Sequence, residues 1–285
     1  ISDHDRKTLE ASLDCLLWVR NELHFATGRK NDQLTFDHQE RIASLLGFES
    51  NEKALAVEQF MQKYYKDASN VNHYSNLILS RSLHIGDERV FSWPKKKVRI
   101  DKNYCIAEGM LALKDKGAPF DDPSVAIKAF EYSQAFNVEI HQSTKDAVLH
   151  YLDGAGDEFR RSRDVSDSFL KILRHKEVYR TLLEMQRLKF LEKYIPEFGD
   201  ISCRVQHDLY HVYTVDAHTL FAVRELERLR GQYKTDFSLL STIFEEIPNP
   251  EILTLAVLFH DIGKAHGKGH AEKGAHIVPA ICERL

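Results

Sequence analysis

The chain contains 285 residues, of which 43% are hydrophobic and 29% are charged, and its formal net charge is −4. This composition is typical of a globular protein with one large or two ordinary domains, and its negative balance disfavours a general nucleic-acid binder. No apolar run approaches the roughly 20 residues of a membrane span, and no signal-peptide pattern opens the chain, so we expect neither nucleic acid nor a membrane as a partner.

The four cysteines are spread over the chain and form no Cys-x-x-Cys pair. Because such a pattern is simplest to explain by reduced thiols, we expect a cytoplasmic location. The sequence begins at Ile1 and ends at Leu285 inside a predicted helix, so we expect it to be a fragment of a longer protein.

The first region, residues 1–82, is predicted to be helical. Apolar residues recur at helical spacing from Leu9 to Leu23 and predict a helix over about residues 3–26. Two more helices are predicted, one over residues 35–46 and one over about residues 51–80. Three consecutive helices with short connections form a bundle.

The second region, residues 83–198, begins with a different pattern. Short alternating stretches at residues 90–93, 97–100 and 104–107 are separated by Gly, Pro or Asp-Lys-Asn. This pattern predicts a small β-hairpin or meander. Asp122-Pro123 then begins a helix that runs to about residue 136, with proline in its first turn.

The rest of the chain is predicted to be helical, with a boundary at residues 194–199 that opens a third region, residues 199–285. The fold class is therefore mainly α, a helical bundle with a small β insertion. The remaining helices are predicted over residues 144–152, 166–191, 206–230, 236–246, 250–262 and 270–284.

The third region contains a candidate metal site. His260 and Asp261 follow a nearly unbroken apolar run, where polar side chains are costly to bury unless they are paired or coordinated. Because neighbouring side chains on a helix diverge by about 100°, an ion bound by both also needs a ligand from another helix. His218 is the candidate, since the amphipathic pattern after it predicts a helix with His218 in its first turn.

Imidazole and carboxylate ligands suit zinc, manganese, iron or magnesium with open water positions, and they indicate hydrolysis of a phosphate ester. A His-Asp pair is also common by chance, and His207-Asp208 is a second one in a different setting. Gly263 is predicted to cap the helix that carries His260.

The most specific motif is Tyr210-His-Val-Tyr-Thr-Val-Asp-Ala-His-Thr219, and Phe259-His-Asp-Ile-Gly-Lys264 lies downstream of it. Upstream stretches add to the pattern, among them Leu17-Trp-Val-Arg-Asn-Glu-Leu-His24 and Phe60-Met-Gln-Lys-Tyr-Tyr65. Together they resemble the bacterial bifunctional PII uridylyltransferase/uridylyl-removing (GlnD) family. The resemblance implies the central helical region of that enzyme, followed by an incomplete HD-type helical domain.

In that family a nucleotidyltransferase domain transfers UMP from UTP to a tyrosine of the PII nitrogen-signalling protein. The HD domain hydrolyses the UMP off with metal-activated water. The resemblance therefore implies PII, UMP and UTP as partners, and Mn²⁺ or Mg²⁺ as cofactor with zinc or iron as alternatives. His218, His260 and Asp261 match the first three metal ligands. The fourth, a later aspartate, is missing, because no aspartate follows Asp261.

Two further residues are expected to act in catalysis. Lys264 would neutralise the substrate phosphate, or would serve as an ordinary cation near a helix C-terminus. His270 matches a histidine that faces the phosphate or a second metal in HD proteins, or it simply begins a surface helix.

Two other functions stay open at this point. The HD part could be a phosphohydrolase of a free nucleotide rather than of a uridylylated protein. Alternatively, the chain could be a non-catalytic helical scaffold that positions the transferase domain and binds PII. The parent protein is expected to be an enzyme, a nucleotidyltransferase and metal-dependent phosphodiester hydrolase, whereas activity of this fragment by itself is left open.

Overall fold

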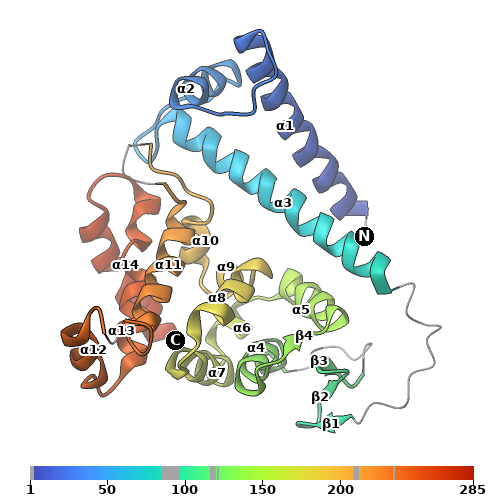
Figure 1. The fold of residues 1–285 in the computed structure, drawn as a ribbon, viewed down its shortest axis with the longest axis vertical. Coiled ribbons are helices and arrows are strands. Elements are labelled where there is room, and N and C mark those ends of the chain that lie inside the picture. The colour runs from blue at the N-terminus through green and yellow to red at the C-terminus, as the bar shows by residue number, and fades with distance from the viewer. Residues whose placement is uncertain (1–2, 85–96, 116–119, 121, 208–211, 234) are drawn as a thin grey trace. The chain divides into compact units, whose positions relative to one another are not determined.

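The computed structural model describes residues 3–84, 97–115, 120, 122–207, 212–233 and 235–285 (Figure 1). The protein is mainly helical with one small sheet, so the predicted fold class is confirmed. Among the described residues, no helix combines the length and apolarity needed to cross a membrane. The chain divides into two compact units. The first comprises Ile1–Phe91, Ile201–Ala217 and Ala265–Lys268, and the second Ser92–Asp200, His218–Lys264 and Gly269–Leu285.

The first unit is built on helices α1 (Asp3–Thr27), α2 (Phe36–Leu45) and α3 (Ala56–His84). Helices α1 and α3 lie side by side and run in opposite directions (Figure 1). Helix α3 begins at Ala56 rather than near residue 51, because the residues before it form a turn held by side chains. Asn51 Oδ1 accepts the backbone N–H groups of Lys53 and Ala54, and Glu58 Oε2 accepts that of Leu55.

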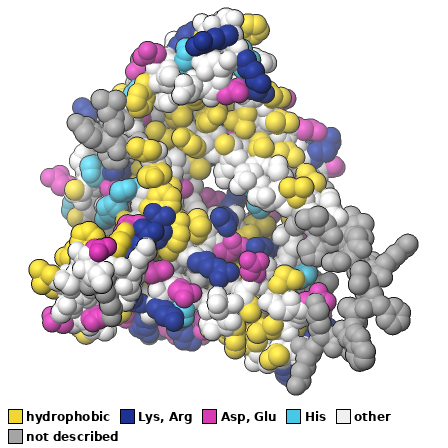
Figure 2. Space-filling model, viewed as in Figure 1, with side chains coloured by type: hydrophobic (Ala, Val, Ile, Leu, Met, Phe, Trp, Pro, Cys, Tyr) yellow, Lys and Arg dark blue, Asp and Glu magenta, His cyan; other side chains and the backbone are white. Residues whose placement is uncertain are grey.

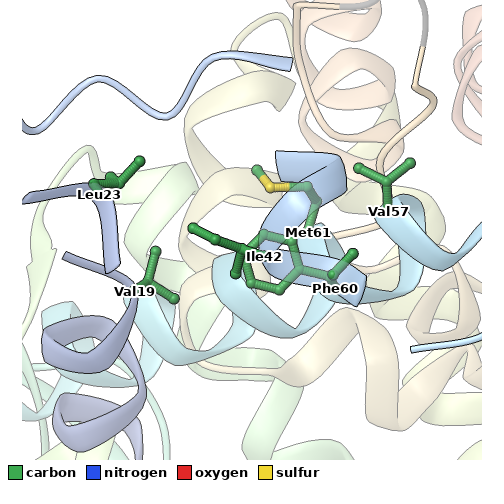
Figure 3. Close-up of a cluster of buried hydrophobic side chains, with 7 residues drawn as sticks. Val19, Leu23, Ile42, Val57, Phe60 and Met61 are labelled. Carbon is green, nitrogen blue, oxygen red and sulfur yellow. The ribbon is translucent and has the colours of Figure 1, made fainter. Parts of the chain in front are cut away.

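One apolar cluster joins the three helices of this unit. Helix α1 contributes Val19 and Leu23, four residues apart on one face, and α2 contributes Ile42 and Ala43. Phe60 of α3 lies at the centre and is fully buried (Figure 3). The cluster also contains Val57 and Met61 of α3. Removing these surfaces from water stabilises the unit by roughly 25 cal/mol per Å² of apolar area.

Truncation of Phe60 is expected to be costly, because it leaves a cavity in the centre of this cluster. We expect Phe60→Ala to lower the free energy of unfolding by about 3 kcal/mol. Phe25→Ala is the matched control, since Phe25 lies on α1 with 78% of its surface exposed, and should change stability by less than about 0.5 kcal/mol. Urea unfolding followed by circular dichroism measures both; equal effects would contradict the assignment of this core.

The sheet of the second unit has four short strands in the order β1-β2-β3-β4. The predicted strands at 97–100 and 104–107 correspond to β1 (Val98–Arg99) and β2 (Tyr104–Ala107), while the one at 90–93 lies outside the described residues. Strand β3 (Met110–Leu113), antiparallel to β2, and strand β4 (Glu139–Ile140), parallel to β3, were not predicted. The β2–β3 connection is the pair Glu108-Gly109, both at positive φ, which is a tight hairpin turn.

The helices of the second unit include α4 (Ser124–Phe136), α5 (Gln142–Gly154), α6 (Asp157–Arg161), α7 (Arg163–Arg174), α8 (Val178–Arg187), α9 (Phe190–Tyr194) and α10 (Pro196–Asp200). The single helix predicted over residues 166–191 is wrong. The chain breaks at His175, which is extended with ψ of 153°, and at Lys189, which adopts the left-handed conformation with φ of 57°. These breaks let Phe159, Phe190 and Tyr194 pack ring against ring in one core.

The C-terminal elements are α11 (Val215–Arg228), α12 (Ser238–Glu245), α13 (Pro250–Phe259), the 3₁₀ helix η2 (Ile262–His266) and α14 (His270–Arg284). Helix α11 begins at Val215 rather than near residue 206, and α13 ends at Phe259 rather than 262. The prediction for residues 270–284 is confirmed. At the predicted boundary, Tyr194 and Phe198 are fully buried. The division into regions 1–82, 83–198 and 199–285 stays a prediction.

Candidate metal centre

The structure brings the three predicted metal ligands together. His218 lies in the first turn of α11, as predicted, while His260 and Asp261 directly follow α13. Asp261 Oδ2 lies 3.1 Å from His260 Nε2 and 3.8 Å from His218 Nε2. One ligand atom from each of the three residues lies within 4.8 Å of the others. Within the described part of the chain, this is the one group of three such side chains that converges in this way.

The end of α13 explains how two adjacent residues can face one point. His260 still has helical dihedral angles and is the C-cap residue of α13, and the tighter helix η2 begins at Ile262. Asp261 thus lies where an α-helix changes to a 3₁₀ helix, and the spacing of an uninterrupted α-helix does not apply to it. The prediction that Gly263 caps α13 is wrong, since Gly263 lies inside η2.

Gly263 has a different function, which is to allow a close approach between backbones. A Cβ atom built on it would lie 2.0 Å from the carbonyl oxygen of His270 and 2.6 Å from the backbone nitrogen of Gly274. Both atoms belong to the first turns of α14. Glycine at this position therefore lets η2, and with it the site, pack directly on the backbone of α14.

The electrostatics of the site centre on the buried Asp261 carboxylate. Lys264, also buried, places Nζ 2.8 Å from Asp261 Oδ2. Burial would raise the pKa of Asp261, but hydrogen bonds from His260 and Lys264, aided by their charges, outweigh it and hold this pKa well below its usual range. The same hydrogen bond, donated to Asp261, raises the pKa of the His260 imidazole against the opposing effect of burial. Asp261 is thus an ionised acceptor.

The donor set fits a divalent metal ion. His260 Nδ1 lies 2.7 Å from the carbonyl oxygen of Val257, which fixes the ring and leaves Nε2 facing Asp261. Two atoms that each lie about 2.1 Å from one ion are at most about 4.2 Å apart, and both distances to Asp261 Oδ2 meet this limit. Two imidazoles and one carboxylate are ligands for a transition metal with open coordination positions.

The two predicted catalytic residues lie in different settings. Lys264 pairs with Asp261, so its charge balances the candidate ligand in this structure. His270 is exposed at the first residue of α14, and a role for its imidazole stays a prediction. Sequence reasoning missed the pairing of Asp261 with Lys264 and the hydrogen bond of His260 Nδ1 to the carbonyl oxygen of Val257. The separation of three residues in each pair is the signal that could have revealed them.

Three family models match the chain. A model described as GlnD PII-uridylyltransferase matches residues 1–79, and one described as the uridylyltransferase GlnD third domain matches residues 104–194. The HD domain model matches residues 209–285, which include all three candidate ligands. The chain belongs to the GlnD uridylyltransferase family. The resemblance predicted from the motifs is therefore confirmed, and it extends over the central region that carries few diagnostic residues.

Individual GlnD relatives agree with the family models. The chain is 35% identical to the bifunctional uridylyltransferase/uridylyl-removing enzyme of Azotobacter vinelandii, over 97% of its length and 31% of the relative. Enzymes of the same name from Stutzerimonas stutzeri and Acinetobacter baylyi are 32% and 33% identical, over 100% and 99% of this chain and 32% and 33% of the relatives. This GlnD-family chain thus spans about a third of the length of the relatives it matches.

Substitution of Gly263 should displace α14 from the site, because the added methyl group meets backbone atoms that cannot rotate away. We expect Gly263→Ala to lower the free energy of unfolding by about 2 kcal/mol. Gly156→Ala is the control, since a Cβ there meets nothing within 4 Å. Urea unfolding compares the two variants, and an unchanged midpoint for Gly263→Ala would contradict the close packing described above.

Replacement of Lys264 should raise the pKa of Asp261 in the metal-free protein. The lowered pKa contributes stability above about pH 4, which is lost as the pH falls through the folded-state pKa of Asp261. Lys264→Met removes one of the two hydrogen-bond donors, so this loss should occur at higher pH. A ¹³C NMR titration of the Asp261 carboxyl measures the shift, with Lys268→Met, at an exposed lysine, as control. Coincident titration curves for the two variants would rule out the proposed coupling.

Proposed function

We propose that this chain supplies the uridylyl-removing site of a bifunctional uridylyltransferase/uridylyl-removing enzyme. The reaction would be hydrolysis of the phosphodiester that joins UMP to a tyrosine of the PII protein. The convergence of His218, His260 and Asp261 within 4.8 Å, inside the segment matched by the HD model, is the observation that carries this proposal. The names of the relatives, which combine uridylyl transfer and removal, agree with it.

A divalent ion held by these three residues would lower the pKa of water and polarise the phosphoryl oxygens. The protein's own contribution is to orient and balance the ligands. The carbonyl of Val257 holds the His260 ring, and Lys264 keeps the Asp261 carboxylate ionised and in place. Three protein ligands would leave coordination positions for water and substrate, and the exposed His260 and partly exposed His218 make the site accessible.

The HD match supports a divalent metal, and we propose Mn²⁺ or Mg²⁺ as the ion. Two imidazoles beside one carboxylate favour Mn²⁺ over Mg²⁺, which prefers oxygen ligands. We further propose PII as the protein partner, with UMP as the product of hydrolysis and UTP as the substrate of the transfer reaction. A cytoplasmic location follows from these partners.

A second candidate is a helical scaffold that positions the transferase domain and binds PII without turnover. One observation favours it. Helix α1 exposes the large apolar side chains of Leu13, Leu17 and Trp18, and hydrophobic side chains are visible on the surface over α1 and α3 (Figure 2). Exposed apolar patches of this kind mark interaction surfaces.

Replacement of His260 distinguishes the uridylyl-removing hydrolase from the non-catalytic scaffold. We expect His260→Ala to weaken Mn²⁺ binding by the chain at least about 100-fold, because the change removes a ligand together with the hydrogen bond to the Val257 carbonyl that orients it. In a full-length enzyme that carries these residues, the same change should abolish release of UMP from uridylylated PII. Isothermal calorimetry and a UMP-release assay measure the two effects. His150→Ala, at an exposed histidine of α5, is the matched control.

Unchanged UMP release by His260→Ala would overturn the hydrolase proposal. If the unmodified chain bound PII but bound neither Mn²⁺ nor UMP, the result would support the scaffold function instead of the hydrolase function. Free nucleotides assayed beside a uridylyl-tyrosyl peptide decide between a nucleotide phosphohydrolase and the proposed uridylyl-removing activity.

A further inference from the structure

Beyond His218, the outward side of α11 carries an aromatic and basic group of side chains. Phe221 follows His218 by three residues and Arg224 follows by six, and Tyr179 of α8 packs beside them. The Arg224 guanidinium carbon lies 4.7 Å from the centre of the Phe221 ring and 5.6 Å from that of Tyr179. The two ring centres are 6.3 Å apart with an angle of 40° between their planes. We call Tyr179, Phe221 and Arg224 the aromatic shelf.

The shelf lies close to the candidate metal centre. Three residues of an α-helix advance the backbone by about 4.5 Å and return to nearly the same side, so Phe221 lies almost one turn beyond His218. All three shelf side chains are partly exposed. A group that is linked through a sugar to a phosphate at the metal centre can therefore reach the shelf.

Neighbouring contacts hold the shelf in place before any ligand binds. The backbone N–H of Tyr179 donates to Glu227 Oε2 at 2.8 Å, which ties the start of α8 to α11. Arg224 donates through Nε to Glu225 Oε1 at 3.1 Å, and its Nη2 lies 3.1 Å from the same oxygen. Because the guanidinium is fixed by a carboxylate and lies over a ring, its orientation costs little further entropy on binding.

The chemistry of the shelf suits a nucleobase. Aromatic rings and guanidinium planes stack on any base, and each such contact contributes about 1–3 kcal/mol to binding. The pair with Glu225 uses Nε and Nη2, and Nη1 carries two more N–H donors, which match the carbonyl acceptors of a pyrimidine such as uracil. A phenyl ring, the group on the other side of a uridylyl-tyrosyl phosphodiester, has no such acceptors.

We propose that the aromatic shelf binds the pyrimidine base of the nucleotidyl group whose phosphate is held at the metal centre. This inference rests on the proposed function, because it takes the phosphate to lie at His218, His260 and Asp261. The shelf would then select a nucleotidyl group over other phosphate esters. Phe221 supplies the stacking surface and Arg224 the polar contact, while Tyr179 holds both in position.

Binding of three phosphate monoesters to the Mn²⁺-loaded chain tests the proposal by calorimetry. UMP carries the base, ribose 5-phosphate lacks it, and phenyl phosphate carries an aromatic ring without acceptors. We expect Phe221→Ala to raise the Kd of UMP about tenfold, equivalent to about 1.4 kcal/mol, and to leave the Kd of ribose 5-phosphate unchanged. Phe221→Tyr should bind UMP with the Kd of the unmodified chain, because it keeps an aromatic ring. Phe221→Leu, which keeps an apolar side chain without a ring, should bind UMP as weakly as Phe221→Ala does.

Phe237→Ala is the matched control, because Phe237 is a half-exposed phenylalanine of the same unit that packs on Tyr233. It should leave all three dissociation constants unchanged.

The proposed role of the shelf is overturned if UMP and ribose 5-phosphate bind equally well to the unmodified chain, or if Phe221→Ala weakens the binding of phenyl phosphate but not that of UMP. If none of the three ligands binds in a Mn²⁺-dependent manner, the metal centre itself is overturned, and the shelf with it. Metal-dependent binding of ribose 5-phosphate without discrimination of UMP refutes the shelf and leaves the proposed function intact.

Discussion

The candidate site depends on a buried carboxylate, that of Asp261, and on the two groups that keep it charged. A carboxylate taken out of water normally becomes neutral unless opposite charge or hydrogen bonds compensate it. Lys264 and His260 provide this compensation from residues within three positions of Asp261. Because His260, Asp261 and Lys264 lie within five consecutive residues, the single turn of chain between α13 and η2 sets most of the geometry of the site. His218 is the candidate ligand that a different helix, α11, must supply.

The way helices end is as important for this protein as the helices themselves. Helix α13 stops at Phe259, and the change to a 3₁₀ helix allows His260 and Asp261 to face one point. The next element can follow closely because Gly263 has no side chain to separate η2 from α14. In the central region, breaks at His175 and Lys189 turn what would be one long helix into α7, α8 and α9, whose aromatic residues then share a core.

In the proposed function, helix α11 connects the metal centre with the selection of the substrate. Its first turn carries His218, and its next turns carry Phe221 and Arg224, so one rigid element would fix the distance between phosphate and base. Sites on helices hold such distances better than sites on loops. The start of α8 contributes Tyr179 and is tied to α11 through Glu227, which would give the central region a role in the proposed function of the HD part.

The sequence determined much of this by local rules. Helical periodicity placed α1 and α14, the amphipathic pattern after His218 placed that residue in a first turn, and the motifs from Tyr210 to Lys264 identified the family. These features depend on residues that are only a few positions apart in the sequence.

Strand β4 was missed because two residues form a strand only where Leu111 pairs with Ile140. The break in the helix predicted over residues 166–191 was missed because no local sequence pattern indicates a positive φ at Lys189. Only the tertiary structure decided that Gly263 separates two backbones rather than caps a helix, that His218 approaches Asp261, and that Tyr179 joins Phe221. Each of these requires atoms from distant parts of the chain to meet, and such contacts are set by packing rather than by sequence spacing.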